Sequence, residues 1–168
     1  SSTLNSLTQA RALTLNAGSG AVSFAGIVGG SLTLGDVSST AANTANTGAI
    51  SGMGAYSITG AATFSASVTG VSSISVSGAA TIGANITTTG SQTYSGSTTL
   101  NSATLVTLAT TNSDISFGGT LNGSAAGKTL TITAGTGAVT FTGAVGGSAA
   151  LGATAITAAT TTNSSTWV

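Results

Sequence analysis

The sequence predicts an all-β fold, and within that class a β-solenoid of short stacked strands. Three observations favour this fold: large apolar residues alternate with hydroxyl residues, small residues dominate the composition, and a long segment recurs. A solenoid pairs each strand with its counterparts about 4.8 Å above and below, so a narrow core of small residues suffices. A β-sandwich, which needs one bulky closed core, is the alternative.

The alternation defines the expected strands. A large apolar residue occupies every second position with Ser or Thr between, which is the period of a half-buried strand. Segments of this kind are residues 13–15, 32–34, 56–58, 74–76 and 130–132. Gly-rich runs such as residues 16–20 and 134–137 separate them and predict turns. Helical periodicity is not sustained anywhere, so we expect strands of three to six residues.

An internal repeat sets the expected organisation. Residues 13–44 and 130–161 align without a gap at an offset of 117, with 19 of 32 positions identical. In two shorter copies Phe117 matches Phe141, and this spacing suits one coil of three short strands. We expect roughly 20–24 residues per coil and seven or eight coils. Residues 1–168 are then a single β-repeat domain, either whole or a segment of a longer array.

The composition excludes most chemistry. Gly, Ala, Ser and Thr make up 114 of 168 residues, the net charge is zero, and His and Cys are absent. The charged side chains are Arg11, Asp36, Asp114 and Lys128. Acid–base catalysis needs two titratable groups close together, whereas the two Asp are far apart in the sequence and follow turn-forming residues. We expect no enzyme activity, no catalytic residue, no metal site and no cofactor.

The sequence also argues against binding to nucleic acid and against a membrane-spanning helix. Two cationic side chains cannot replace the counterions along a phosphate backbone, so nucleic acid is not expected as a partner. The most apolar stretch, residues 21–28, is much shorter than the roughly 18 residues of a membrane-spanning helix. No transmembrane segment is therefore expected.

Residues 130–147 read LTITAGTGAVTFTGAVGG, and residues 88–96 read TTGSQTYSG. Both segments resemble the β-strand repeats of large bacterial exoproteins of the filamentous-haemagglutinin-like family, and the likeness extends over roughly residues 13–160. The resemblance implies a secreted, right-handed parallel β-helix at the bacterial cell surface. It also implies a role as an adhesin stalk or as a filament of an extracellular matrix.

The ends of the predicted solenoid indicate how it functions. Natural proteins blunt exposed strand edges with charge, Pro or a covering element, and this sequence has almost no charge and no Pro. We therefore expect the ends to pair with more of the same chain or with another subunit, giving an extracellular filament or stalk. Trp167 and Val168 are the candidate subunit contact.

Two other functions remain open from the sequence. An adhesin module would use the Thr, Ser and Asn surface to bind glycans or host receptors. An ice-binding solenoid would need Thr-x-Thr arrays at the same place on successive coils. Candidate arrays occur at residues 87–89 and 129–133, but the sequence does not align them with comparable arrays on each coil.

Overall fold

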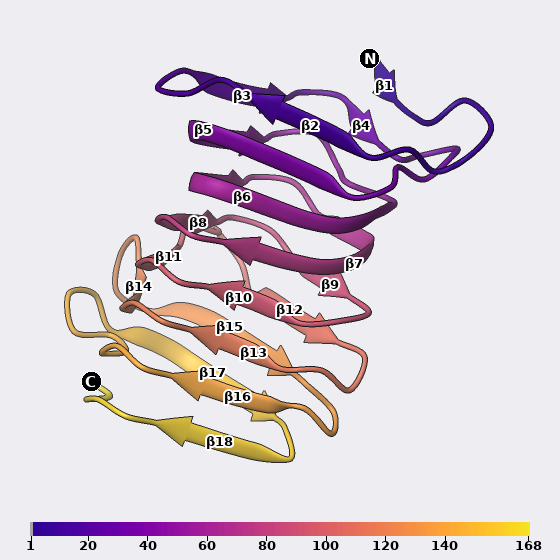
Figure 1. Cartoon of the computed structure of the whole chain (residues 1–168). Helices are drawn as coiled ribbons and strands as arrows, with labels where there is room; N and C mark the ends of the chain where they lie inside the picture. The colour runs from indigo at the N-terminus through magenta and orange to yellow at the C-terminus, as the bar shows by residue number, and fades with distance from the viewer. Residues whose placement is uncertain (1) are drawn as a thin grey trace.

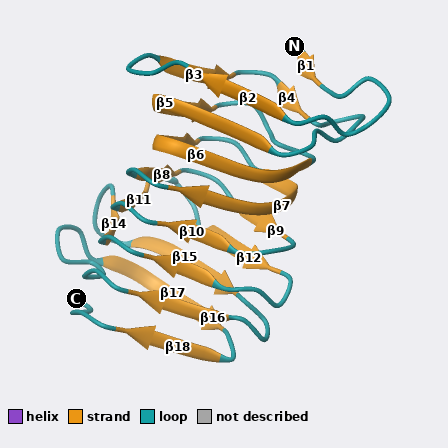
Figure 2. Ribbon diagram, in the orientation of Figure 1, coloured by secondary structure: helices purple, strands orange, loops and turns teal. Residues whose placement is uncertain are grey.

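The computed structural model describes residues 2–168 and shows a β-solenoid of about seven turns (Figure 1). Every strand pairing is parallel, and each coil lies directly on the one before it. Figure 2 shows the described chain as strands and loops only, so no helix within residues 2–168 is long and apolar enough to cross a membrane. The predicted all-β solenoid is confirmed.

The strand pairings form three stacks, which we call faces 1, 2 and 3. Face 1 consists of β2 (Leu13–Asn16), the first part of β5 (Val37–Asn46), the middle of β6 (Met53–Phe64), the second part of β7 (Val68–Val76), β10 (Gln92–Tyr94), β13 (Ile115–Phe117), β16 (Ala138–Phe141) and β18 (Thr160–Asn163). Face 2 consists of β3 (Ala21–Phe24), the last parts of β5 and β6, β8 (Ala80–Ile82), β11 (Thr98–Leu100), β14 (Leu121–Gly123), and single bridges at Val145 and Trp167. Face 3 consists of β1 (Thr3–Leu4), β4 (Ile27–Val28), a bridge at Ile50, the start of β7, β9 (Ile86–Thr88), β12 (Val106–Thr110), β15 (Lys128–Thr133) and β17 (Leu151–Thr157).

Coil length varies along the solenoid. Tyr56, Ile74 and Gln92 are paired in succession, so the coils between them are shorter than the sequence predicted. Phe117 pairs with Phe141, as their matching sequence positions predicted. The later coils are longer because they place extra residues between face 2 and face 3, at residues 101–105 and 124–127. The extra residues lie in loops, so the ladders continue unbroken.

Four strands are longer than predicted. β5, β6, β7 and β17 contain 10, 12, 9 and 7 residues, whereas the sequence predicted three to six. In β5 and β6 the chain stays extended through the corner between faces 1 and 2, and the register shifts between Thr40 and Asn43. The sequence pattern of alternating apolar residues does not show where such a corner lies. The reason is that the backbone hydrogen bonds to the next coil continue on both sides of the corner.

The core consists of ladders of like residues. On face 3, the fully buried residues Ile50, Val68, Ile86 and Leu108 succeed one another from coil to coil. On face 1, the rings of Tyr94, Phe117 and Phe141 stack with centroid separations of 5.4 and 5.2 Å. Each such aromatic pair adds about 0.5–1.5 kcal/mol beyond the burial of its surface. Stacking of equivalent side chains therefore stabilises a thin coil.

The two long sequence copies occupy different faces. Leu13–Asn16 lies on face 1, whereas the matching residues 130–133 lie on face 3. Likewise, Phe24 lies on face 2 and its sequence match Phe141 on face 1. The offset between the two copies is thus not a whole number of coils. The repeated unit is a strand, a turn and a second strand, and it fits two different corners of the solenoid.

Candidate assembly surfaces

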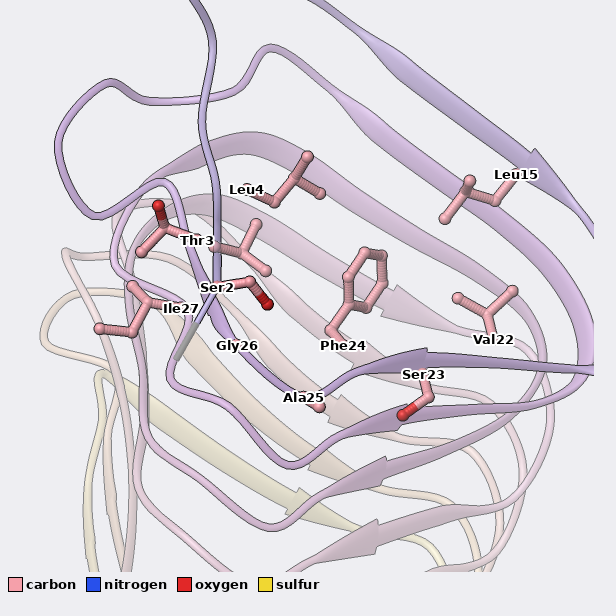
Figure 3. Close-up of a pocket in the computed structure, with 11 residues that line it drawn as sticks. Ser2, Thr3, Leu4, Leu15, Val22, Ser23, Phe24, Ala25, Gly26 and Ile27 are labelled. Carbon is pink, nitrogen blue, oxygen red and sulfur yellow. The ribbon is translucent and has the colours of Figure 1, made fainter.

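The first coil leaves an open apolar end. Among residues 2–168, β2 and β3 pair with β5 on one side and with no strand on the other. The side chains of Leu4, Leu15, Val22 and Phe24 face a hollow of about 360 Å³ at this end, as Figure 3 shows. Positions equivalent to these in the middle of the solenoid are buried by the next coil. Within the described residues, Leu15 and Val22 are therefore only half-buried and Leu4 is exposed, whereas Phe24 is buried.

The last coil is open in the same way. Within the described chain, β17 pairs with β15 and β18 with β16, and neither has a partner beyond. Ile156 is half-buried, although its ladder neighbour Ile132 is fully buried. All residues of β18 are exposed. Among residues 2–168, no strand covers this end.

Trp167 and Val168, the predicted subunit contact, lie on this open end. The Trp167 ring packs edge-on against Phe141 at 5.2 Å and 80° and remains 43% exposed. Val168 is 67% exposed, and its N–H donates to the Val145 carbonyl at 2.9 Å. Trp167 pairs with Val145 in the ladder that runs along face 2. One side of the indole is therefore buried in the solenoid, and the other is available to a further coil.

The two acids hold neighbouring coils together. Asp36 and Asp114 lie at corners just before face-1 strands, as expected for turn carboxylates. Their Oδ1 atoms accept the backbone N–H of Ala55 and Ala138, respectively, both at 2.8 Å and both from the following coil. The acids are four coils apart along face 1, or about 19 Å at the usual strand spacing. The structure does not bring them together.

Side-chain amides act in the same way, which the sequence did not reveal. The Oδ1 atoms of Asn85 and Asn112, at corners, and of Asn122, within β14, accept a backbone N–H from the following coil at 2.9, 3.1 and 3.0 Å. Lys128 Nζ donates to the Ser102 carbonyl oxygen at 2.7 Å. These polar side chains thus form hydrogen bonds with backbone groups that have no partner in the strand ladders.

The interior contains a polar network. Gln92 is fully buried, its Oε1 accepts the hydroxyl of Tyr94 at 3.0 Å, and its Nε2 donates to the Ala109 carbonyl at 2.9 Å. Tyr56 donates to Asn46 Oδ1 at 2.9 Å in a second buried pair. Burial raises the pKa of both tyrosines above the usual range of a phenol, and the Asn46 hydrogen bond lowers that of Tyr56 somewhat.

Face 1 presents an unbroken outward file of hydroxyl side chains, which we call the hydroxyl file. Each member is paired with the next, so the residues lie at the same place on successive coils. The hydroxyl file consists of Thr14, Ser38, Ser57, Ser75, Thr93, Ser116, Thr140 and Thr162. The corresponding outward file of face 2 is interrupted by Ala45 and Asn122. The candidate arrays at residues 87–89 and 129–133 lie instead on face 3, where Ala109 separates them.

Comparison with protein-family models, curated proteins and solved structures finds no match for this chain. Among residues 2–168, no three His, Cys, Asp or Glu residues gather into a group that could hold a metal ion. The open ends and the outward faces are therefore the features from which function can be inferred.

Proposed function

We propose that this chain is a non-enzymatic structural protein of an extracellular bacterial filament, stalk or matrix. In this proposal its end coils join further coils of the same fold. The observation that carries the proposal is the pair of open ends, each with unpaired strand edges and apolar core side chains. The bacterial and extracellular setting is supported by the resemblance of residues 130–147 and 88–96 to exoprotein repeats.

Pairing of the ends has a clear physical gain. An added coil supplies backbone partners to the free edges of β17 and β18. It also removes the exposed part of Trp167 and Ile156 from water, at about 25 cal/mol per Å² of apolar surface. Neither edge carries a Pro or a charged residue that would oppose pairing. A further coil is therefore the natural cover for each end.

Negative-stain electron microscopy of the purified protein tests the proposal. We expect fibres of constant width, and we expect them to be lost in Trp167→Ser. Leu105→Ser is the matched control, because Leu105 is 46% exposed, close to the 43% of Trp167, but lies away from both ends. Isolated short rods of the unaltered protein at every concentration would contradict the proposal and favour an adhesin module that binds glycans or receptors.

The hydroxyl file favours ice binding as a second candidate function. The members of the hydroxyl file repeat at the strand spacing of about 4.8 Å, and none of them is charged. A regular, uncharged array of hydroxyls can hold an ordered layer of water. Thermal hysteresis is the direct measurement. Thr93→Tyr should abolish it, while Thr99→Tyr, which alters face 2 of the same coil, should leave it intact.

A further inference from the structure

We propose that a hollow on the outward surface of face 3 binds a neutral sugar unit. The outward side chains that line this site, which we call the Leu105 hollow, are those of Leu105, Thr129, Thr131, Ala153 and Ala155. Its volume is about 370 Å³, inside the range of about 300–1,000 Å³ that is usual for small-molecule sites. The inference goes beyond the proposed filament and does not rest on it.

Two irregularities of the solenoid lie at the Leu105 hollow. The first is the loop of residues 101–105, which ends directly before β12 and leaves the Leu105 side chain 46% exposed. The second is a bulge in β17, where the pairing with β15 shifts between Lys128 and Leu130 and β17 has one extra residue. A bulge interrupts the ladder and changes the direction of nearby side chains, and bulges are common beside functional sites.

The strand pairings bring the lining side chains together. Thr131 pairs with Ala155, and both alternate with the inner row of their strands. Thr129 and Ala153 lie two residues earlier on the same strands and share the outward side. The pairing of β12 with β15 places Leu105 beside Thr129 in one outward row. The floor therefore combines two hydroxyls with two methyl groups, and Leu105 adds a larger apolar side chain.

The Leu105 hollow stays accessible in a filament and in an isolated rod alike. β12, β15 and β17 are successive strands of face 3 (Figure 1), and the hollow lies on their outward surface. Strands of further coils are added along the stack, not over this surface. Ligand binding and self-association therefore use different surfaces and can be measured separately.

The chemistry of the lining selects the class of ligand. None of the lining residues is charged, and the neighbouring Lys128 donates from Nζ to the Ser102 carbonyl oxygen at 2.7 Å. A charged ligand would lose hydration here without gaining a partner. A hydrocarbon would cover the hydroxyls of Thr129 and Thr131 without offering them a hydrogen bond, which is also costly. The ligand that fits is neutral and has both an apolar face and hydroxyl groups.

A pyranose ring of a neutral sugar has this combination. Its C–H face packs on the side chain of Leu105 and on the methyl groups of Ala153 and Ala155. Its hydroxyls exchange hydrogen bonds with Thr129 and Thr131, because a threonine hydroxyl both donates and accepts. The contact area is small, so the affinity for a single sugar unit is low.

Saturation-transfer difference NMR tests the site, because it observes the free ligand and works with rods and fibres alike. The probes are the methyl glycosides of glucose, galactose and mannose. We expect the unaltered protein to transfer saturation to the ring protons of at least one glycoside. The transfer should be lost in Leu105→Ser, which removes the larger apolar side chain, and in Thr131→Val, which keeps the shape of the side chain but removes its hydroxyl.

Matched controls exist for both variants. Leu32→Ser alters a side chain of similar exposure, 44%, in the loop between β4 and β5. Thr99→Val removes an outward hydroxyl from β11 on face 2. Both control variants should retain the transfer that the unaltered protein shows.

Each contrary outcome is distinct. No transfer to any of the three glycosides from the unaltered protein would overturn the site. Transfer retained in both Leu105→Ser and Thr131→Val would also overturn it, by placing the binding elsewhere. Displacement of the glycoside by an equal concentration of cyclohexanol would overturn the sugar in favour of a general apolar ligand. Fibres without glycoside binding would overturn this site alone, whereas glycoside binding by isolated rods would support the site and contradict the filament.

Discussion

The buried pair Gln92 and Tyr94 offers a quantitative test of the core. Gln92→Leu removes the Oε1 that accepts the Tyr94 hydroxyl at 3.0 Å, in a site where both side chains are fully buried. An orphaned buried hydroxyl costs about 1–3 kcal/mol. The new Leu itself suits its ladder, since Gln92 pairs with Ile74 and Ile115. We therefore expect a loss of about 1–3 kcal/mol in the free energy of unfolding, caused by the polar partner left behind.

The double variant separates the hydrogen bond from packing. Tyr94→Phe alone leaves Gln92 Oε1 without its donor and should destabilise the chain by a similar amount, while Gln92→Leu with Tyr94→Phe removes both groups. Replacing both partners by apolar groups can be nearly neutral, but the Ala109 carbonyl still loses Gln92 Nε2 in the double variant. The double variant should therefore be about as stable as Gln92→Leu alone, and more stable than the sum of the two single losses predicts. Guanidinium unfolding followed by circular dichroism, at one fixed protein concentration, gives the four free energies. Purely additive losses in the double variant would refute the reasoning.

Three further predictions concern other parts of the fold. Because burial raises the pKa of Tyr56 and Tyr94, the unfolded state loses protons first, so stability should fall as the pH rises above about 10; Tyr94→Phe should reduce that slope in chemical unfolding. Asp114→Ala removes an acceptor of an inter-coil backbone bond and should lower stability by about 1 kcal/mol in denaturant melts, whereas Asp114→Asn retains an acceptor and should not. At Gly29 the backbone φ is 72° and an added Cβ would overlap the carbonyl of the next coil, so Gly29→Ala should abolish cooperative thermal unfolding. Gly127→Ala, with φ of 83° but nothing within 4 Å, should cost only about 1–2 kcal/mol by the same measurement.

The fold class and the stacking of Phe117 on Phe141 could be predicted because they depend on local alternation and on matching copies close in sequence. The face that a strand occupies could not be predicted, because it depends on the summed lengths of all preceding corners. These lengths vary from coil to coil. For this reason residues 130–133 lie one face away from their match at residues 13–16. The hydroxyl file was missed for the same reason, because the interval between its members changes from coil to coil.

The buried polar network was missed for a different reason. When hydroxyl residues surround a Gln in a strand, the sequence does not show whether its side chain points inward or outward. Gln92 precedes Thr93 and Tyr94, and only the ladder shows that it shares the inner row of Ile74. Trp167 was predicted as a contact residue from its position in the sequence. Its seat against Phe141 required the structure.

Sedimentation velocity over a wide range of protein concentration tests the central claim most directly, namely that the open end coils join to further coils. We predict that the sedimentation coefficient of the unaltered protein rises with concentration and that Trp167→Ser lowers the rise, while Leu105→Ser does not. A single species with the mass of one chain at every concentration would contradict this claim.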